Sequence, residues 1–329
     1  MVETKKTSRA LWHIAKGRSV LIEESLPALQ AGEALVRTLF SGISRGTERL
    51  VLAGLVPQSE HENMRCPFQQ GRFPFPVKYG YCAVGVVEDG PPEWLGRNVF
   101  VLHPHQDRFV VPLAALNPLP EHLPPRRATL AANMETALNA VWDSGAGPGD
   151  RIAVVGGGVV GLLVAFLCAG LPGAEVSLAD IVPGRAAIAA SLGARFVDAS
   201  APSTALAGSD VVFHTSATAA GLELAIASAA NEARVVEMSW YGSGPVAAGL
   251  GGAFHSRRLH LIASQVGQIA ASRRPRWDFA RRMAKALDLL GDYRLDALIT
   301  ADIAFASLPA ALPAILAQGA LGLATCVTF

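Results

Sequence analysis

Two kinds of hydrophobic pattern follow one another along the chain. In the first third, short runs of β-forming residues alternate with glycine turns. These runs cover residues 8–14, 19–26, 33–43, 81–90, 96–104 and 107–112. Residues 55–77, between the third and fourth runs, are polar and rich in proline, which is typical of a functional loop or a mobile lid. We therefore expect an antiparallel, β-rich unit in this part of the chain.

After residue 130, strand patterns alternate with helix patterns. A helical pattern over residues 130–145 ends at a glycine. Apolar strand patterns follow at residues 151–156, 174–180, 194–199, 209–216, 233–240 and 259–264, with helical patterns at 159–171, 184–194 and 218–230. Two more helical patterns (277–291 and 308–319) and an apolar strand (323–329) complete the chain. Such alternation predicts an α/β protein with a parallel sheet and crossover helices.

One stretch of the chain permits a second interpretation. Residues 152–174 carry no charge, and about 20 apolar residues are enough to span a bilayer. Gly157 and Gly161 even have the spacing that membrane helices use for close packing. A strand buried on both faces and the helix after it explain the same stretch, because such strands lose their polar alternation. We favour this explanation and expect no membrane span; residues 1–17 also lack the apolar core of a secretion signal.

Composition excludes several classes of protein. Of the 329 residues, 51% are hydrophobic and 17% are charged, which argues against a disordered chain. Lys and Arg number 28 against 27 Asp and Glu, so we expect neither a nucleic-acid surface nor a polybasic membrane anchor. The basic clusters at 255–260 and 272–277 are too short to change this expectation. Four scattered cysteines without a CxxC pair indicate a reducing compartment, and we expect a cytoplasmic protein.

Residues 156–161 read Gly-Gly-Gly-Val-Val-Gly, which matches the G-x-G-x-x-G fingerprint of dinucleotide-binding folds. The fingerprint follows an apolar strand and opens an apolar helix, which is the context that it requires. Gly156 permits the tight turn, Gly158 lets the backbone approach a pyrophosphate, and Gly161 permits close packing of helix on strand. The N–H groups at the start of the helix, at Val159 and Val160, are expected to bind phosphate.

An acidic residue follows the fingerprint at the expected distance. Asp180 ends the next predicted strand, where a carboxylate accepts hydrogen bonds from an adenosine ribose. The same charge repels a 2′-phosphate, so we expect NAD as the cofactor. Arg185 lies nearby and keeps NADP open as the alternative.

The order of these patterns resembles the medium-chain dehydrogenase/reductase superfamily, which includes the zinc-type alcohol dehydrogenases. The resemblance is carried by residues 41–54, by residues 78–90 and by the glycine fingerprint. It implies a GroES-like catalytic domain, over residues 1–133 and 266–329, and a Rossmann dinucleotide-binding domain over residues 134–265. It also implies a homodimer formed by edge strands of the nucleotide-binding domains.

The sequence departs from the superfamily at each position that holds the catalytic zinc. The first falls on Ser44 or Arg45, the second on Tyr81, with Cys82 after it, and the third on Ala132 or Asn133. Zinc requires three or four converging nitrogen, sulfur or carboxylate ligands, which these residues do not supply. The four-cysteine lobe of the structural zinc is also absent from the sequence, so we expect a member without either zinc.

Without a metal, a side chain or an ordered water must polarise the substrate oxygen. The resemblance places Tyr81 at a vacated metal position and His103 at the substrate pocket, and it makes Thr47, in a predicted turn, a proton relay. These three are the candidate catalytic residues. Each also has a structural explanation, which is space filling for Tyr81, a structural histidine for His103 and turn stabilisation for Thr47.

The remaining candidates fall into two groups. The expected substrate-binding residues are Ser44, Arg45, Glu48, His105 and Asn133. The expected cofactor-binding residues besides the fingerprint are Thr136, Asp180, Arg185, Ser216, Ser239, Trp240 and Tyr241. We predict a zinc-independent, NAD(P)(H)-dependent oxidoreductase that acts on the carbonyl/alcohol pair of a small molecule. The alternatives are a reductase of enones or quinones, and a protein that binds NAD without catalysis.

Overall fold

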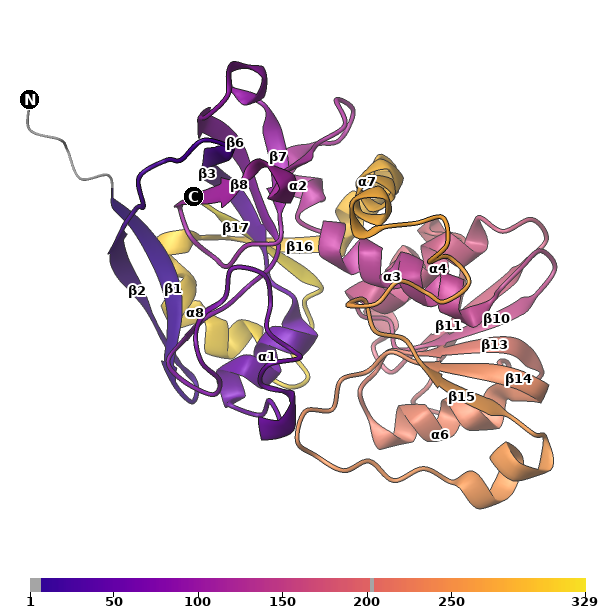
Figure 1. Cartoon of the computed structure of the whole chain (residues 1–329). Coiled ribbons are helices and arrows are strands. Elements are labelled where there is room, and N and C mark those ends of the chain that lie inside the picture. Colours follow the sequence, from indigo (N-terminus) through magenta and orange to yellow (C-terminus); the bar gives the residue numbers. More distant parts are fainter. Residues whose placement is uncertain (1–6, 202–203) are drawn as a thin grey trace, which may run out of the picture. The chain divides into compact units, whose positions relative to one another are not determined.

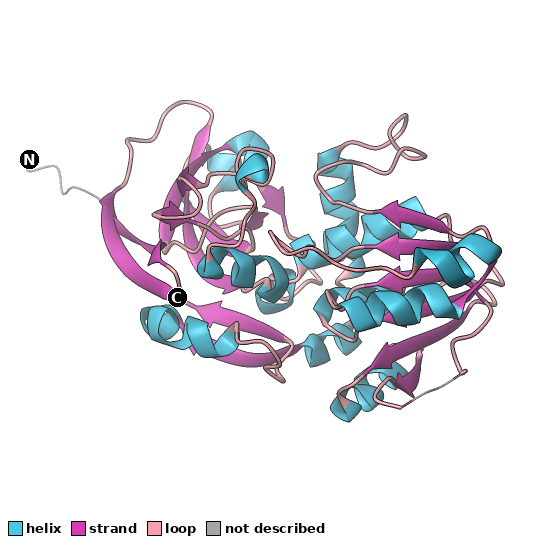
Figure 2. Ribbon diagram, turned by 90° about the horizontal axis from the view of Figure 1, so that it is seen from below, coloured by secondary structure: helices cyan, strands magenta, loops and turns pink. Residues whose placement is uncertain are grey.

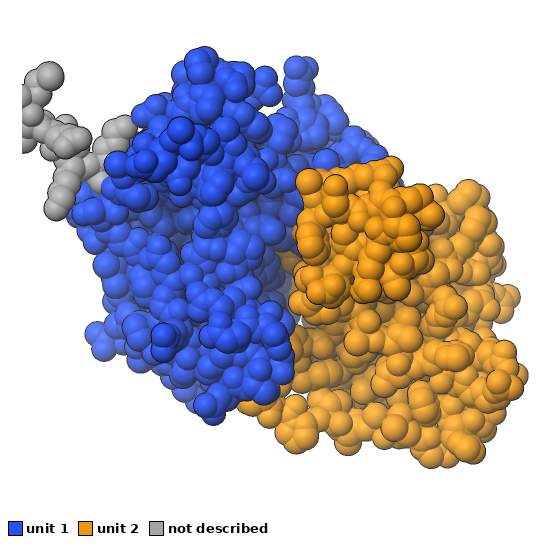
Figure 3. All heavy atoms as spheres, viewed as in Figure 1, with its two compact units in different colours: residues 1–132, 283–329 blue, residues 133–282 orange. Residues whose placement is uncertain are grey.

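The computed structural model describes residues 7–201 and 204–329 (Figure 1). The chain divides into two compact units (Figure 3). Unit 1 comprises residues 1–132 and 283–329, and unit 2 comprises residues 133–282. The chain thus leaves unit 1 once and returns to it after unit 2 is complete.

The described part of unit 1 is built around two sheets. Its seven-stranded sheet has the order β16-β17-β3-β6-β7-β9, with β8 paired to β3, and is antiparallel except between β16 and β17. These strands are β3 (Glu33–Gly42), β6 (Ala83–Asp89), β7 (Asn98–Val101), β8 (Arg108–Pro112), β9 (Asn117–Pro118), β16 (Ile299–Ala304) and β17 (Ala324–Thr328). The second sheet, of order β2-β1-β5-β4, consists of β1 (Thr7–Ala15), β2 (Arg18–Ser25), β4 (Gln70–Gly71) and β5 (Val77–Lys78).

Helix α1 (Arg45–Ala53) replaces the turn that the sequence analysis predicted around Thr47. Leu50, Val51 and Leu52 are buried in this helix, and Gly54 ends it in the left-handed conformation (φ 67°). The pattern of small and polar residues at its start concealed the helix. Thr47 therefore lies in the first turn of α1 rather than in a loop, and the prediction of a turn is wrong.

The other helices of unit 1 are short. They are α2 (Pro125–Ala128), α8 (Leu308–Ile315) and the 3-10 segments η1 (Gln58–Glu60), η2 (Pro92–Trp94), η3 (Leu113–Ala115), η6 (Tyr293–Leu298) and η7 (Phe305–Ser307). Helices α3 (Ala131–Ser144) and α7 (Phe279–Leu289) each cross a boundary between the units in sequence.

Unit 2 contains, within its described residues, a six-stranded sheet whose neighbouring strands are all parallel. Figure 2 shows these strands side by side and flanked by helices. In the order β12-β11-β10-β13-β14-β15, the strands are β10 (Arg151–Val155), β11 (Glu175–Asp180), β12 (Arg195–Asp198), β13 (Ser209–His214), β14 (Ala229–Glu237) and β15 (His260–Ala263). The helices are α4 (Val159–Ala169), α5 (Ala186–Ser191) and α6 (Ala219–Ser228), with the turns η4 (Pro183–Arg185) and η5 (Leu250–Phe254).

The strand order of this sheet reverses between β10 and β13. From β10 the chain moves outward to β11 and β12, and it then returns to β13 on the other side of β10. Because such crossovers are right-handed, helices α4 and α6 cover opposite faces of the sheet (Figure 1). Ligands of open parallel sheets bind at the carboxyl ends of the strands, at the point of reversal.

The uncharged stretch at residues 152–174 forms β10, α4 and the turn after them. The apolar residues of β10 are buried, and α4 is only 11 residues long. Within residues 7–201 and 204–329, no helix is both long enough and apolar enough to cross a membrane. The absence of alternation in this stretch reflects a strand that is covered on both faces.

Residues 266–282 belong to unit 2, whereas the sequence analysis assigned them to the first domain. The Arg282 side chain is buried, and its guanidinium donates hydrogen bonds to Glu135 Oε1 (3.0 Å) and Asn139 Oδ1 (2.7 Å) on α3. Its remaining donors bind the carbonyl oxygens of Val266 and Gln268. These bonds tie the segment to α3.

Candidate functional site

The glycine turn after β10 requires glycine at two of its positions. Gly156 has φ +111°, and a Cβ atom there would lie 2.7 Å from the backbone nitrogen of Ser216. A Cβ atom on Gly161 would lie 1.9 Å from the carbonyl oxygen of Gly156. The first glycine therefore allows the turn, and the last lets helix α4 approach strand β10 closely.

Gly158 has a different environment. It caps α4 with φ −72°, which any residue adopts, and a Cβ atom there would meet nothing within 4 Å. The backbone N–H groups of Val159 and Val160, in the first turn of α4, have no partners within the helix. The turn thus presents open space and backbone donors at a helix N-terminus, which suits a phosphate group.

Asp180 ends β11 beside this turn. Its Oδ2 accepts a hydrogen bond from the backbone N–H of Gly157 (2.5 Å), and its Oδ1 accepts one from Val182 (2.8 Å). Arg185 is half-buried in η4. Burial lowers the pKa of its guanidinium, and the Asp180 charge opposes this shift. Next to Asp180, Ile181 is 69% exposed, an apolar surface that the sequence analysis did not single out.

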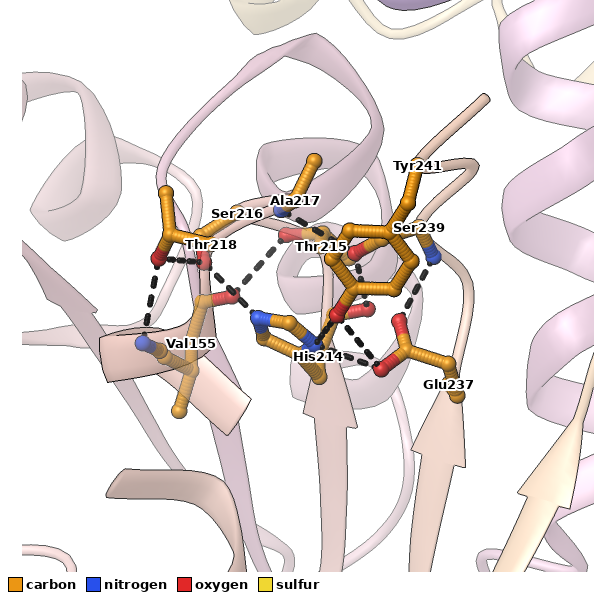
Figure 4. Close-up of polar contacts among 10 residues, drawn as sticks. Val155, His214, Thr215, Ser216, Ala217, Thr218, Glu237, Ser239 and Tyr241 are labelled. Carbon is orange, nitrogen blue, oxygen red and sulfur yellow. Dashed lines mark hydrogen bonds and ion pairs between the residues drawn. The ribbon is translucent and has the colours of Figure 1, made fainter. Parts of the chain in front are cut away.

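A polar network joins the carboxyl ends of β13 and β14 (Figure 4). His214 and Glu237 are paired in register across the two strands, and His214 Nδ1 lies 2.8 Å from Glu237 Oε2. His214 Nε2 lies 2.7 Å from the Ser216 hydroxyl, and the Tyr241 hydroxyl donates to Glu237 Oε2 (3.0 Å). Ser239 donates its backbone N–H to Glu237 Oε1 (2.8 Å).

This network brings together three of the expected cofactor-binding residues, Ser216, Ser239 and Tyr241. Its two central residues, His214 and Glu237, were missed because their pairing depends on the parallel register of two strands, which the sequence does not display. Trp240 is half-buried beside the network. Asn133 and Thr136 are half-buried on α3, three residues apart and so on one side of that helix.

Unit 1 contains a buried carboxylate that is close to the candidate residue Tyr81. The Glu48 side chain on α1 is fully buried; its Oε1 accepts the backbone N–H of Ser44 (2.7 Å), and its Oε2 lies 3.1 Å from His105 Nε2. The other ring nitrogen of His105 lies 2.6 Å from the Ser41 hydroxyl. The His105 ring is thus held between a hydroxyl and a carboxylate, and its side chain is 1% exposed.

Tyr81 lies close to this buried carboxylate. Burial raises the pKa of the Tyr81 phenol well above its ordinary value, and Cys82 and Glu48 add to the rise. Hydrogen bonding by the side chains of Ser44 and Thr47 opposes the rise without cancelling it. The phenol therefore stays protonated and is suited to donate a hydrogen bond rather than to act as a base.

His103 has a packed environment. Its ring stacks on Phe109 with the centroids 3.8 Å apart and on Phe68 at 5.5 Å, and the residue is 5% exposed. Its Nδ1 lies 3.0 Å from the carbonyl oxygen of Pro104. Burial lowers the pKa of His103 to about 3, although the bond to Pro104 opposes this shift. The ring is neutral at physiological pH, and its surroundings favour a packing role.

Arg45 uses its guanidinium within unit 1. The group donates hydrogen bonds to the carbonyl oxygens of Gly322 and Ala320, the latter at 2.7 Å. These bonds hold the segment that precedes β17 against the start of α1. Arg45 was expected to bind an anionic group of the substrate. It could do so only while its guanidinium also bonds to these two carbonyl oxygens.

The residues at the superfamily's zinc positions do not fit a zinc ion. Ser44 and Tyr81 offer neutral hydroxyls, Arg45 offers a cation, and Ala132 offers no ligand. Burial raises the pKa of the Cys66 thiol to about 12, which disfavours the thiolate that zinc binds. Among residues 7–201 and 204–329, no three His, Cys, Asp or Glu side chains are grouped so that they could hold a metal ion.

No protein-family model matches the sequence. Solved structures do resemble the chain over its whole length. L-Idonate 5-dehydrogenase from Escherichia coli is 15% identical with a TM-score of 0.80, over 98% of this chain and 99% of that chain. 2R,3R-Butanediol dehydrogenase from Bacillus subtilis is 18% identical, with a TM-score of 0.77 and the same shares. A short chain alcohol dehydrogenase from Escherichia coli, complexed with NADH, is 17% identical with a TM-score of 0.77, also over 98% and 99%.

These similarities confirm the predicted fold class. The chain has the fold of the zinc-type alcohol dehydrogenase-like enzymes, an α/β architecture with a Rossmann domain and a β-rich GroES-like domain.

Proposed function

We propose that the protein is a zinc-independent, NAD(H)-dependent oxidoreductase that interconverts a carbonyl compound and an alcohol. The observation that carries this proposal is the glycine turn of unit 2, whose open Gly158 lies beside an Asp180 carboxylate bonded to Gly157. Its fold, which it shares with dehydrogenases, supports the same reaction class. In this proposal unit 2 binds the coenzyme and unit 1 supplies the groups that act on the substrate.

The residues of unit 2 fit a dinucleotide. The N–H groups at the start of α4 would bind its pyrophosphate, and Asp180 would accept the adenosine ribose hydroxyls. Ile181, exposed beside Asp180, offers an apolar surface for the adenine ring. The Asp180 charge disfavours a 2′-phosphate, which supports NAD over NADP. When bound, the coenzyme supplies or accepts the hydride of the reaction.

Tyr81 is the proposed donor to the substrate oxygen. Its raised pKa keeps the phenol protonated, so it can hydrogen-bond to a carbonyl oxygen and stabilise the charge that develops there. The side chains of Thr47 and Ser44, which oppose the rise of the Tyr81 pKa, would provide a path for the proton that completes the alcohol. The buried Glu48 and His105 hold the start of α1, and with it Ser44, in place.

The zinc independence of the reaction is proposed from the donor set. The superfamily's ligand positions carry hydroxyls, a guanidinium and an alanine, and the neighbouring thiol of Cys66 is held protonated. A hydrogen-bond donor at Tyr81 would replace the polarising role of a metal.

The proposal also includes the oligomeric state of the protein and its location in the cell. The edge strand β15 has Leu261 at 40% exposure, which supports a homodimer formed by β15 strands of two copies. Light scattering of the purified protein measures that state directly. The four scattered cysteines support a cytoplasmic location.

The reaction class is tested with the purified protein, assayed for metal content and treated with a chelator. Binding of NADH and NAD⁺ is measured by fluorescence and calorimetry, and turnover is measured against ketones, aldehydes, enones and quinones. We expect coenzyme binding and turnover of ketones or aldehydes that survives chelation. Turnover of enones or quinones alone would support the reductase alternative, and binding without any turnover would support a non-catalytic protein. Activity that is lost with a removed metal would overturn the zinc-independent proposal.

A further inference from the structure

The network at the ends of β13 and β14 contains a carboxylate that pairs with no lysine or arginine among the described residues. Glu237 accepts hydrogen bonds from three groups, the backbone N–H of Ser239, the Tyr241 hydroxyl and the His214 ring. Two of these donors are neutral groups, and the ring can also donate as a neutral imidazole.

The His214 ring connects the carboxylate to the serine hydroxyl. Its Nδ1 lies 2.8 Å from Glu237 Oε2, and its Nε2 lies 2.7 Å from the Ser216 hydroxyl. The Thr218 hydroxyl lies 2.9 Å from that of Ser216 and accepts the backbone N–H of Gly221. A continuous chain of polar contacts thus runs from the N-terminus of α6 to the Glu237 carboxylate, and the Tyr241 hydroxyl also lies 3.3 Å from His214 Nδ1 (Figure 4).

The carboxylate is ionised although it is largely buried. Burial alone would raise the pKa of Glu237, but hydrogen bonding and electrostatic attraction by His214, together with the hydrogen bonds of Ser239, hold it below the ordinary value. The side chain is 16% exposed. A partly buried negative charge that has no lysine or arginine partner favours a positively charged ligand nearby.

The place of Glu237 in the fold indicates which part of a ligand lies near it. Asp180 and the glycine turn occupy the ends of β11 and β10, on one side of the point where the strand order reverses. A dinucleotide crosses this point, so its second half extends over the ends of β13 and β14. In a nicotinamide coenzyme this half carries the ring, which is cationic when oxidised and neutral when reduced.

We propose that Glu237, held by His214 and Tyr241, makes the site distinguish oxidised from reduced coenzyme by favouring the cationic nicotinamide ring. This inference rests on the proposed function and assigns to Glu237 a specificity role in coenzyme binding. The three residues act together: Tyr241 and His214 position the carboxylate, and the carboxylate supplies the charge.

The test compares the dissociation constants of NAD⁺ and NADH for the wild type and for Glu237→Gln, measured by calorimetry and by NADH fluorescence. We expect the variant to bind NAD⁺ about tenfold more weakly and NADH within about twofold of the wild type, which corresponds to about 1.4 kcal/mol of lost discrimination. Glu223→Gln removes an exposed carboxylate from helix α6 of the same unit and is expected to change neither constant. Tyr241→Phe leaves the carboxylate charged and is expected to keep most of the discrimination.

A second measurement uses the wild type alone, so it does not depend on the folding of a variant. ADP-ribose has the same phosphates and adenosine as the coenzyme but no nicotinamide ring. We expect the preference for NAD⁺ over ADP-ribose to fall as salt is raised, because it contains a charge interaction, and the preference for NADH over ADP-ribose to stay constant.

Three outcomes separate this inference from the proposed function. Equal weakening of NAD⁺ and NADH in Glu237→Gln would give Glu237 a structural role only and would overturn the inference. A salt-independent preference for NAD⁺ over ADP-ribose in the wild type would do the same. If the wild type binds neither coenzyme, the proposed function fails first, and this inference fails with it.

Discussion

The carboxylate of Asp180 accepts a hydrogen bond from the backbone N–H of Gly157 at 2.5 Å. This bond joins the end of β11 to the glycine turn after β10, and it fixes a negative charge beside the turn. A second bond, from the N–H of Val182, occupies the other carboxylate oxygen and prevents the side chain from rotating away.

The position of this charge predicts coenzyme choice. Asp180→Asn keeps the size of the side chain and removes the charge that repels a 2′-phosphate, while its single oxygen can keep one of the two backbone N–H bonds. We expect the ratio of NADP to NAD affinity to rise at least about tenfold, or about 1.4 kcal/mol, in binding titrations. Glu175→Gln, at the other end of β11, removes an exposed carboxylate and serves as the control, with no change expected. An unchanged ratio in Asp180→Asn would mean that the adenosine ribose does not bind here.

Replacement of Gly161 and of Gly158 by alanine is expected to have different effects on stability and on coenzyme binding. A Cβ at Gly161 would lie 1.9 Å from a backbone oxygen, so Gly161→Ala should lower the free energy of unfolding. Overpacking of this kind costs about 1–3 kcal/mol. Gly158→Ala meets open space and should fold normally, but its methyl group would occupy the space for the pyrophosphate. Denaturation and coenzyme titration of both variants measure the difference; normal coenzyme affinity in Gly158→Ala would contradict the proposed phosphate site.

Tyr81→Phe removes the proposed donor to the substrate oxygen. Loss of one such donor lowers turnover by about 10²–10³-fold, whereas NADH binding should be unchanged because Tyr81 belongs to unit 1. Steady-state kinetics and NADH titration measure the two effects separately. Tyr293→Phe, at a tyrosine that is 77% exposed, is the control and should retain full activity. If Tyr81→Phe retains wild-type turnover, the phenol has only a structural role.

His103 predicts a pH dependence of stability. Its pKa is lowered from 6.5 to about 3, so between these values the unfolded chain binds a proton that the folded chain does not. The free energy of unfolding should therefore fall as the pH falls, by about 1.4 kcal/mol per pH unit from this residue. His103→Phe keeps the stacking on Phe109 and removes the titrating ring, so its stability should depend less steeply on pH. Urea denaturation at several pH values measures the slopes.

An exposed histidine provides the comparison for this experiment. His122 is exposed, and His122→Gln should leave the slope as it is in the wild type. Equal slopes in the wild type and His103→Phe would show that His103 is protonated in the folded protein as readily as in the unfolded chain.

The sequence predicted the parts of the molecule that depend on neighbours along the chain. The glycine turn, the burial of β10 and the position of Asp180 at the end of β11 follow from local constraints on backbone conformation and from hydrophobic pattern. Helix α1 was missed because Ser44, Gly46 and Thr47 are typical of turns, and its buried side is recognisable only once the strands around it are known.

The polar networks could not be predicted in this way. His214 and Glu237 meet because β13 and β14 are paired in one particular parallel register, and a shift of one residue would move each side chain to the other face of the sheet. Glu48 and His105 likewise come from separate parts of unit 1. His103, a candidate acid or base in the sequence, lies between two phenylalanine rings that no local pattern connects to it.

Strand β17 has a consequence for biosynthesis. It lies inside the seven-stranded sheet, where Cys326 pairs with Gly42 of β3. A ribosome makes all of unit 2 between these two residues, so unit 2 can fold while unit 1 still lacks one of its central strands. During that interval residues 40–42 of β3 lack their β17 partner, although β8 already pairs with residues 33–37, and nascent chains on neighbouring ribosomes present the same unpaired end. Chaperone dependence and misassembly during translation are therefore expected to arise from unit 1, and a circular permutant that begins with β16 and β17 should reduce both.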